Sequence, residues 1–178
     1  MKNYIVFDLE WNQSANGKER SVPHFPFEII EIGAVKLNEN FQMTGEFHRL
    51  VRPQVYTQMH HAISEVTHMN MKELRNSGEL FPDAATEFLA WCGEDAVFCT
   101  WGNMDLLELQ RNMDYYHMDN PFPKPLFYYD VQKLYGLFCR ENARISLDSA
   151  VEEQNLMEER PFHRALDDAY YTGKLLTM

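Results

Sequence analysis

The feature that most constrains the fold is a near-continuous apolar run, Tyr4–Leu9, with one acidic residue inside it. A run this apolar and rich in β-forming residues is typical of a buried central strand. Residues i and i+2 of a strand point to the same face, so Asp8 and Glu10 are expected to project side by side. Carboxylates that close repel each other unless a cation such as Mg²⁺ or Mn²⁺ lies between them. The alternative is a strand end that emerges into solvent.

Periodicity and turn residues predict an α/β chain in which three strands form an antiparallel meander and two more alternate with helices. The expected strands are Tyr4–Leu9, Ile29–Leu37, Phe41–Val51, Ala96–Trp101 and Phe127–Tyr129. The expected helices are Ser64–Leu74, Pro82–Trp91, Asp105–Tyr116, Val131–Cys139, a helix capped by Ser146 and ending at Glu153, and one from Arg164 to the end. This pattern implies a mixed sheet covered by helices. The last helix is expected to reach Met178 without a stop signal, as in a chain trimmed from a longer one.

The composition limits the partners and the cellular setting. The net charge of −11 argues against a nonspecific nucleic-acid coat, because affinity for phosphate backbones comes largely from Lys and Arg. A site of carboxylates that holds divalent cations can still attract phosphate locally, because the cations supply the positive charge. Cys92, Cys99 and Cys139 have no metal-ligand spacing and are expected to be reduced, mostly buried thiols in a cytoplasmic protein. The sequence lacks an apolar run of about eighteen residues and a signal peptide, so no membrane association is expected.

Two further segments carry candidate chemistry. Asp105 follows the Ala96–Trp101 strand, where sites of α/β proteins tend to lie, although an Asp there is also an ordinary helix N-cap. The segment 163–169 (HRALDDA) places His163 five residues before Asp168. A histidine titrates near neutral pH and can accept a proton from an attacking water, while the acid could bind a metal. The alternative is a helix N-terminus, where acidic residues favour the helix dipole.

In this order and spacing, these motifs resemble the DEDDh exonuclease family, part of the proofreading-exonuclease superfamily. The segment 29–35 (IIEIGAV) is similar to that family's second strand, and 163–169 matches its third motif almost letter for letter. The resemblance implies a ribonuclease-H-like mixed five-stranded sheet flanked by helices, with residues 1–178 as a single exonuclease domain. It also implies a metal-dependent enzyme that removes nucleotides from the 3′ ends of single-stranded RNA or DNA.

The resemblance further implies the role of each site residue. Two divalent cations, Mg²⁺ or Mn²⁺, would be bound by four acidic residues: Asp8, Glu10, Asp105 and Asp168. His163 would activate water as the general base. Two cations can clamp the attacking and leaving oxygens of an in-line displacement at phosphorus. Glu28 and Glu31 receive no ligand role from the resemblance.

The sequence departs from the family pattern at two places. Trp11 stands where the first motif often has Thr or Ala, and Trp101–Gly102 stands where the second often has His-Asn. The Trp-Gly form resembles the branch of small-RNA-trimming, KapD-like exoribonucleases, which favours RNA as substrate. Trp11 could bind substrate by stacking on the terminal base. The alternative is a core residue beside Phe7 and Leu9.

Of the two adjacent acids in the third motif, helix geometry alone favours Asp167 as the ligand, because it shares a face with His163 if both are helical. The family pattern favours Asp168. Pro161 keeps the preceding residues from being helical, so His163 is expected on the entering loop or at the first helical position. At such a position, the direction of the His163 side chain is not set by the regular rotation of the helix from one residue to the next. We therefore select Asp168, and expect Asp167 to face solvent or a basic partner.

Four arginines in the region of the third motif could meet phosphates: Arg140, Arg144, Arg160 and Arg164. The favoured interpretation for most of them is a solvated face paired with nearby acidic residues: Glu152, Glu153, Glu158 and Glu159.

Two other function classes remain open. One is a DNA proofreading-type exonuclease subunit, whose acidic surface and single domain would suit a polypeptide partner. The other is a noncatalytic nucleic-acid-binding module on the same fold, since fold does not fix function. The intact set of acids and His163 argues against the second. Protein partners cannot be identified from the sequence.

Overall fold

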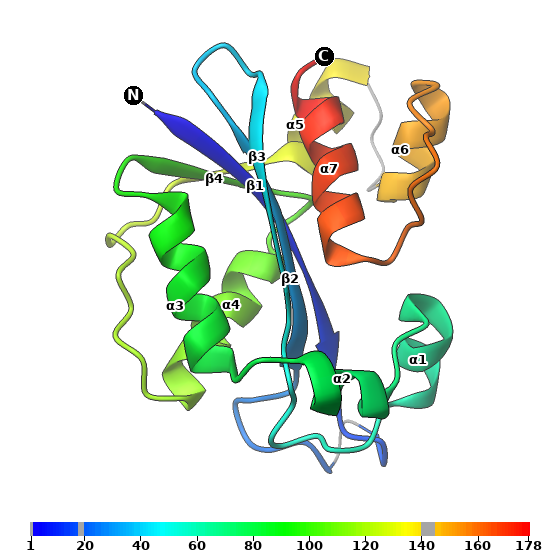
Figure 1. Cartoon of the computed structure of the whole chain (residues 1–178). Helices are drawn as coiled ribbons and strands as arrows, with labels where there is room; N and C mark the ends of the chain where they lie inside the picture. The colour runs from blue at the N-terminus through cyan, green and yellow to red at the C-terminus, as the bar shows by residue number, and fades with distance from the viewer. Residues whose placement is uncertain (1, 18–19, 140–144) are drawn as a thin grey trace.

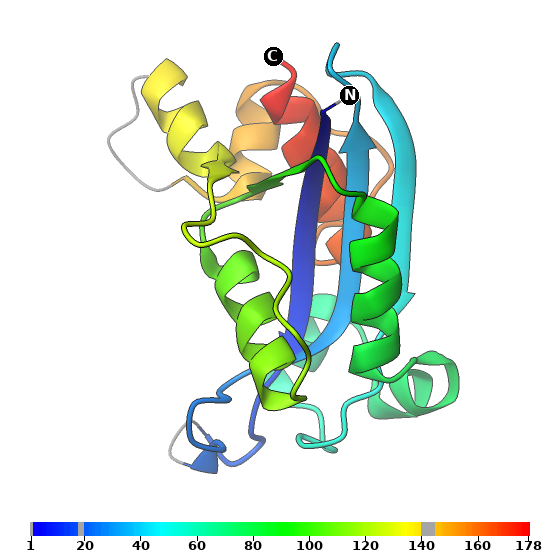
Figure 2. The ribbon, with the colours of Figure 1, turned by 90° about the vertical axis from the view of Figure 1, so that its left-hand side faces the viewer.

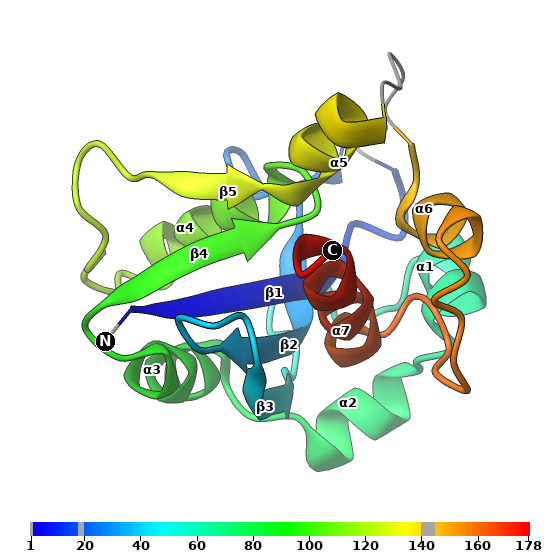
Figure 3. The ribbon, with the colours of Figure 1, turned by 90° about the horizontal axis from the view of Figure 1, so that it is seen from above.

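The computed structural model describes residues 2–17, 20–139 and 145–178. These residues form a five-stranded sheet of order β3-β2-β1-β4-β5 (Figures 1 and 3). The strands are β1 (Asn3–Asn12), β2 (Glu28–Leu37), β3 (Met43–Leu50), β4 (Ala96–Thr100) and β5 (Tyr128–Asp130). The helices are α1 (His61–Thr67), α2 (Met71–Ser77), α3 (Phe81–Cys92), α4 (Met104–Tyr115), α5 (Val131–Cys139), α6 (Leu147–Glu153) and α7 (Ala165–Leu176).

The sheet has the mixed topology that the sequence predicts. β1 pairs antiparallel with β2, and β2 antiparallel with β3. β4 pairs parallel with β1, and β5 parallel with β4. Such a sheet, flanked by helices, is the ribonuclease-H-like fold. β1 is therefore the central strand, and its register sets Asp8 opposite Gly33 and Glu10 opposite Glu31 on β2.

Helices cover both faces of the sheet, and the alternation of β1 side chains fits this. Figure 1 shows α3 and α4 on one side and α5, α6 and α7 on the other; Figure 2 shows the first side turned toward the viewer. Ile5, Phe7 and Leu9 belong to the large core cluster under α3 and α4, whereas Val6 packs in the cluster that includes residues of α7. Strand alternation therefore aims the acidic positions of β1 at the α7 side.

The prediction of one helix over Ser64–Leu74 is wrong, because this segment spans the end of one short helix, α1, and the start of another, α2. His68, between them, has a left-handed backbone with φ of 57°, which ends α1. Asn70 then caps α2, because its side chain accepts a hydrogen bond from the backbone N–H of Glu73. The Asn-x-x-Glu spacing is a helix-start signal that the apolar periodicity obscured.

Smaller differences lie at element ends. α7 ends at Leu176, where the N–H and hydroxyl of Thr177 donate to the Lys174 carbonyl, so the expected continuation to Met178 is wrong. Ser146 does precede α6, but its hydroxyl contacts Asp148 and not a backbone amide.

The cysteines are free; Cys92 and Cys99 are buried and Cys139 is exposed. None of the helices in the described part of the chain is long and apolar enough to cross a bilayer.

The start of α7 lies directly against β2 at Gly33. A Cβ atom at this position would lie 2.0 Å from the backbone nitrogen of Leu166 and 2.1 Å from the carbonyl carbon of Ala165. Both atoms are backbone, so no side-chain rotation can relieve the overlap. The absence of a side chain at Gly33 therefore lets α7 approach the strand that pairs with the acidic positions of β1.

We predict that Gly33→Ala lowers the free energy of unfolding by about 3 kcal/mol or more, because α7 must move away from the sheet. Gly45→Ala on β3 is the matched control. Its Cβ would meet two Trp91 ring atoms, at 3.6 and 4.0 Å, which are ordinary contacts. This substitution should therefore cost less than about 1 kcal/mol. Urea unfolding of both variants checks this; equal, small losses would contradict the close approach.

Candidate active site

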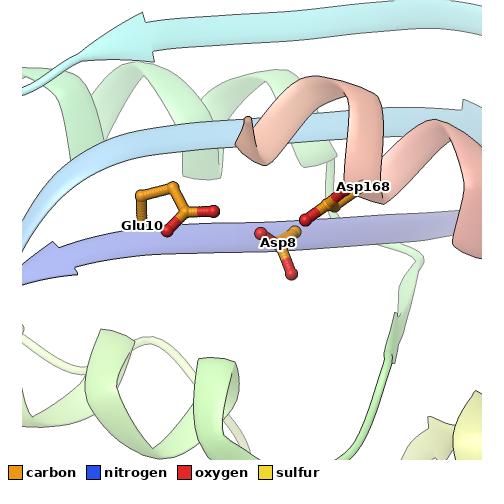
Figure 4. A group of neighbouring side chains, drawn as sticks. All are labelled: Asp8, Glu10 and Asp168. Atoms are coloured by element: carbon orange, nitrogen blue, oxygen red, sulfur yellow. The ribbon is translucent and has the colours of Figure 1, made fainter. Parts of the chain in front are cut away.

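Three of the predicted acidic residues meet between β1 and the start of α7. Asp8 and Glu10 on β1 and Asp168 on α7 each offer a carboxylate oxygen, and these oxygens lie within 4.8 Å of one another. Figure 4 shows the three side chains gathered in the space between the strand and the helix. Asp8 and Glu10 share a face as strand alternation predicts. Clustered carboxylate oxygens are the donor set that hard divalent cations prefer, so these residues fit a metal.

The pKa values of the three clustered acids are raised, which also fits a site for a cation. Burial, followed by the charges of Asp105, Glu10 and Asp168, raises the pKa of Asp8 well above its ordinary value. Burial, with the charge of Asp168 next, raises the pKa of Glu10 to about 8. Burial raises the pKa of Asp168 to about 7, against a hydrogen bond from the His163 amide. Without a cation, these groups hold protons at pH values where free carboxyls are ionised.

Asp105 lies beside the cluster but outside the group of three converging oxygens. It is the second residue of α4 and is 5% exposed. Its Oδ1 accepts a hydrogen bond from the backbone N–H of Leu9, 3.1 Å away, which anchors the helix start to β1. Burial raises the pKa of Asp105 to about 7. The alternative that Asp105 is an ordinary N-cap is wrong, because Asn103 occupies that position.

His163 lies on the loop that enters α7, as predicted, and is exposed. Its backbone is left-handed, with φ of 64°. The backbone N–H of His163 donates to both carboxylate oxygens of Asp168, at 3.3 and 3.1 Å. Arg164 follows at the N-cap position of the helix. The histidine is therefore tied through its own backbone to an acid of the cluster.

The two adjacent acids of α7 have different surroundings. Asp168 is 8% exposed and belongs to the cluster. Asp167 accepts a hydrogen bond from Arg160 Nη1, 3.3 Å away. The prediction that Asp168 faces the acids of β1 and Asp167 a basic partner agrees with these contacts.

Trp11 is partly buried and packs against the core cluster that contains Phe7 and Leu9. Its ring centroid lies 5.5 Å from that of Phe27. A register shift between Glu10 and Trp11 interrupts the pairing of β1 with β2 here. These contacts fit the core alternative; stacking on a base stays a prediction.

The glutamate partners predicted for Arg164 are wrong. For Arg160 the prediction is partly right, because its charge, after hydrogen bonds from Tyr170 and Lys174, helps to lower the pKa of Glu158. Arg164 pairs with Glu31 at 2.9 Å, and Arg160 with Glu46 and Asp167 at 3.0 and 3.3 Å. Arg140 and Arg144 lie outside the described residues. Glu31 is the residue that sequence reasoning passed over. A charged residue inside the otherwise apolar segment 29–35 was the available signal, because a buried charge needs a partner.

Comparisons with known proteins show the family to which the chain belongs. The family model RNase_T, described as Exonuclease, matches residues 5–176. The probable 3′–5′ exonuclease KapD of Bacillus subtilis is 28% identical over 175 residues, covering 98% of this chain and 82% of that protein. A PolC-type DNA polymerase III of Thermotoga petrophila is 31% identical over 172 residues, 97% of this chain but 11% of the polymerase.

The fold of this chain is similar to that of a solved nuclease structure. The nuclease domain of 3′hExo, a DEDDh family member bound to rAMP, superposes with a TM-score of 0.79 at 23% identity. The match covers 99% of this chain and 90% of that one.

The raised pKa values predict how stability depends on pH without metal. A carboxyl whose pKa is higher in the folded than in the unfolded chain stabilises the fold only while protonated. That contribution is full below the ordinary pKa of about 4 and is lost as pH rises through about 7 to 8. In a chelator, the melting temperature should therefore fall between about pH 5 and pH 8, and Asp8→Asn should flatten the fall.

Adding Mg²⁺ or Mn²⁺ should reverse this loss, because the cation binds the ionised carboxylates and competes with protons. The rise in melting temperature on adding metal should be larger at pH 8 than at pH 5.5 in the natural sequence, and small at both in Asp8→Asn. Differential scanning fluorimetry measures both. A metal effect that is the same at the two pH values would argue that these acids do not bind the cation.

Proposed function

This chain belongs to the RNase_T family of exonucleases; from that premise we propose that it is a 3′–5′ exonuclease of the DEDDh type that shortens single-stranded RNA one nucleotide at a time. Residues 1–178 act as a single exonuclease domain. The observation that carries the proposal is the convergence of Asp8, Glu10 and Asp168 beside the loop that holds His163. These residues come from opposite ends of the chain, and the fold brings them to one place.

The mechanism assigns a role to each of these side chains. Two divalent cations, Mg²⁺ or Mn²⁺, held by Asp8, Glu10, Asp105 and Asp168, would supply the positive charge that offsets charge growing around phosphorus. His163 accepts a proton from the water that attacks the last phosphodiester. The bond from phosphorus to the 3′ oxygen of the preceding nucleotide breaks, which releases a nucleoside 5′-monophosphate. Asp168 also holds the His163 backbone, so it helps to orient the base.

RNA is the favoured polymer. The Trp101–Gly102 form of the second motif resembles the RNA-trimming branch, and the 3′hExo nuclease domain was solved with a ribonucleotide, rAMP. The 2′-hydroxyl is the group by which a protein distinguishes RNA from DNA. Trp11, whose ring is only partly buried, is proposed to contact the terminal base.

A second candidate is DNA proofreading. The PolC-type DNA polymerase III relative favours it, although this chain spans only 11% of that polymerase. A noncatalytic binding module is disfavoured by the convergence of acids that a catalytic cation would require.

A cleavage assay separates these functions. With 5′-labelled RNA and DNA of equal sequence, we expect a ladder that shortens from the 3′ end, requires Mg²⁺ or Mn²⁺, and develops faster on RNA. Asp8→Asn, folded as judged by circular dichroism, should produce no ladder because the cluster loses a carboxylate. Full activity of Asp8→Asn would contradict the metal assignment, internal cleavage would contradict exonuclease action, and faster loss of DNA would favour proofreading.

The adjacent acids of α7 provide a matched pair of variants. Asp168→Ala should abolish cleavage, because it removes both a ligand and the anchor of the His163 backbone. Asp167→Ala removes a contact with Arg160 and should cost less than about 1 kcal/mol of stability while leaving substantial activity. Initial rates and urea unfolding of the two variants measure this. The reverse outcome would place the ligand one residue earlier in the helix.

A further inference from the structure

Glu31 is a charged residue in the interior of the sheet, paired across β1–β2 with Glu10. It is 0% exposed. Its Oε1 accepts hydrogen bonds from Arg164 Nε and Nη2, at 3.1 and 2.9 Å, and lies 2.6 Å from His48 Nε2. Its Oε2 accepts from the backbone N–H of Ala165 at 3.0 Å and from Arg164 Nε at 3.3 Å. Both oxygens are therefore already engaged by the protein.

These bonds keep Glu31 ionised beside a group of acids that favour protonation. Burial alone would raise the pKa of Glu31, but the hydrogen bonds from His48, Arg164 and Ala165 outweigh burial and hold its pKa below the ordinary value. Glu31 thus differs from Glu10, its neighbour across the strand pair, whose pKa is raised.

The anchor is attached to the start of α7. Ala165 is the first residue of that helix, and its amide is one of the helix-terminal donors that need a partner. Arg164, at the N-cap position, makes no side-chain capping bond, so Glu31 supplies an acceptor from another element. Two residues along β2, Gly33 admits the same helix start to backbone contact.

The helix start in turn carries two residues of the site. His163 directly precedes Arg164. Asp168 lies in the first turn of α7 and accepts the hydrogen bond from the His163 backbone N–H. Any shift of Arg164 and Ala165 relative to β2 would move His163 and Asp168 together. Because β2 is hydrogen-bonded in register to β1, Glu31 links their position to that of Asp8 and Glu10.

We propose that Glu31, through Arg164 and the amide of Ala165, is a positioning residue that sets His163 and Asp168 against Asp8 and Glu10. This inference rests on the roles proposed above for His163 and Asp168. In this role Glu31 acts only through α7 and contacts neither the substrate nor the attacking water. Outer partners of this kind, when removed, typically lower activity by about tenfold to a hundredfold.

Glu31→Gln tests the proposal, because it keeps the shape of the side chain and removes its charge. In the complete chain, with RNA and metal both saturating, we expect kcat to fall by about tenfold to a hundredfold while KM for RNA stays within about threefold. The same decrease should remain at the highest Mn²⁺ concentration. Recovery at high Mn²⁺ would mean that Glu31 is itself a ligand and would overturn the proposal.

Glu28→Gln is the matched control. Glu28 is equally buried on β2, but its oxygens accept from the backbone N–H groups of residues 54–56 and from the Tyr116 hydroxyl, away from α7. It should lose stability as Glu31→Gln does, yet keep kcat per folded molecule. Equal kcat in the two variants would reduce Glu31 to a stabilising role and overturn the proposal.

Arg164→Gln provides a second variant should Glu31→Gln fail to fold, because the arginine side chain is 33% exposed and more easily replaced. It should lower kcat, and combining it with Glu31→Gln should add little further loss, since the two act as one unit. A rise in KM with unchanged kcat would instead assign Arg164 to a phosphate contact, and would contradict positioning.

Asp8→Asn in the same assay separates failure of the Glu31 proposal from failure of the proposed exonuclease function. If it is inactive while Glu31→Gln is fully active, this inference alone fails; if Asp8→Asn is active, the proposed function fails.

Discussion

One constraint governs the rest of this structure: carboxylates that repel one another, two partly buried and one buried, are held at one place on the sheet. Asp8, Glu10 and Asp168 approach one another in surroundings that raise all three pKa values, with Asp105 close enough to contribute. Packing must hold these groups together against a force that favours separation or protonation. A bound cation would relieve this repulsion, and the chemistry proposed for the site follows from that requirement.

Two devices hold the acids in place. The first is the β1–β2 register, which fixes Asp8 and Glu10 on the central strand. The second is the docking of α7 on β2, where Gly33 allows backbone contact and Glu31 binds the helix start. Glu31 contrasts with the cluster, because both of its oxygens accept from Arg164 and one also accepts from the Ala165 amide, whereas Asp168 accepts from the His163 backbone N–H.

The sequence predicted what depends on local geometry. Strand alternation placed Asp8 and Glu10 on one face, and Pro161 implied that His163 precedes the last helix; both agree with the structure. Contacts between distant segments were out of reach. Glu31 and Arg164 are 133 residues apart, and no local pattern pairs them. The anchor of Asp105 on the Leu9 amide is equally non-local, whereas the break before α2 was signalled by Asn70 and missed.

Calorimetric titration with Mn²⁺, in the presence of a nucleoside 5′-monophosphate, measures whether these carboxylates bind two divalent cations. For the natural sequence we expect two ions per chain, with proton release that grows from pH 8 toward pH 6.5 as the cluster carries more protons. Asp8→Asn should lose this binding. Unchanged stoichiometry and affinity in Asp8→Asn, or no binding by the natural sequence, would contradict the claim.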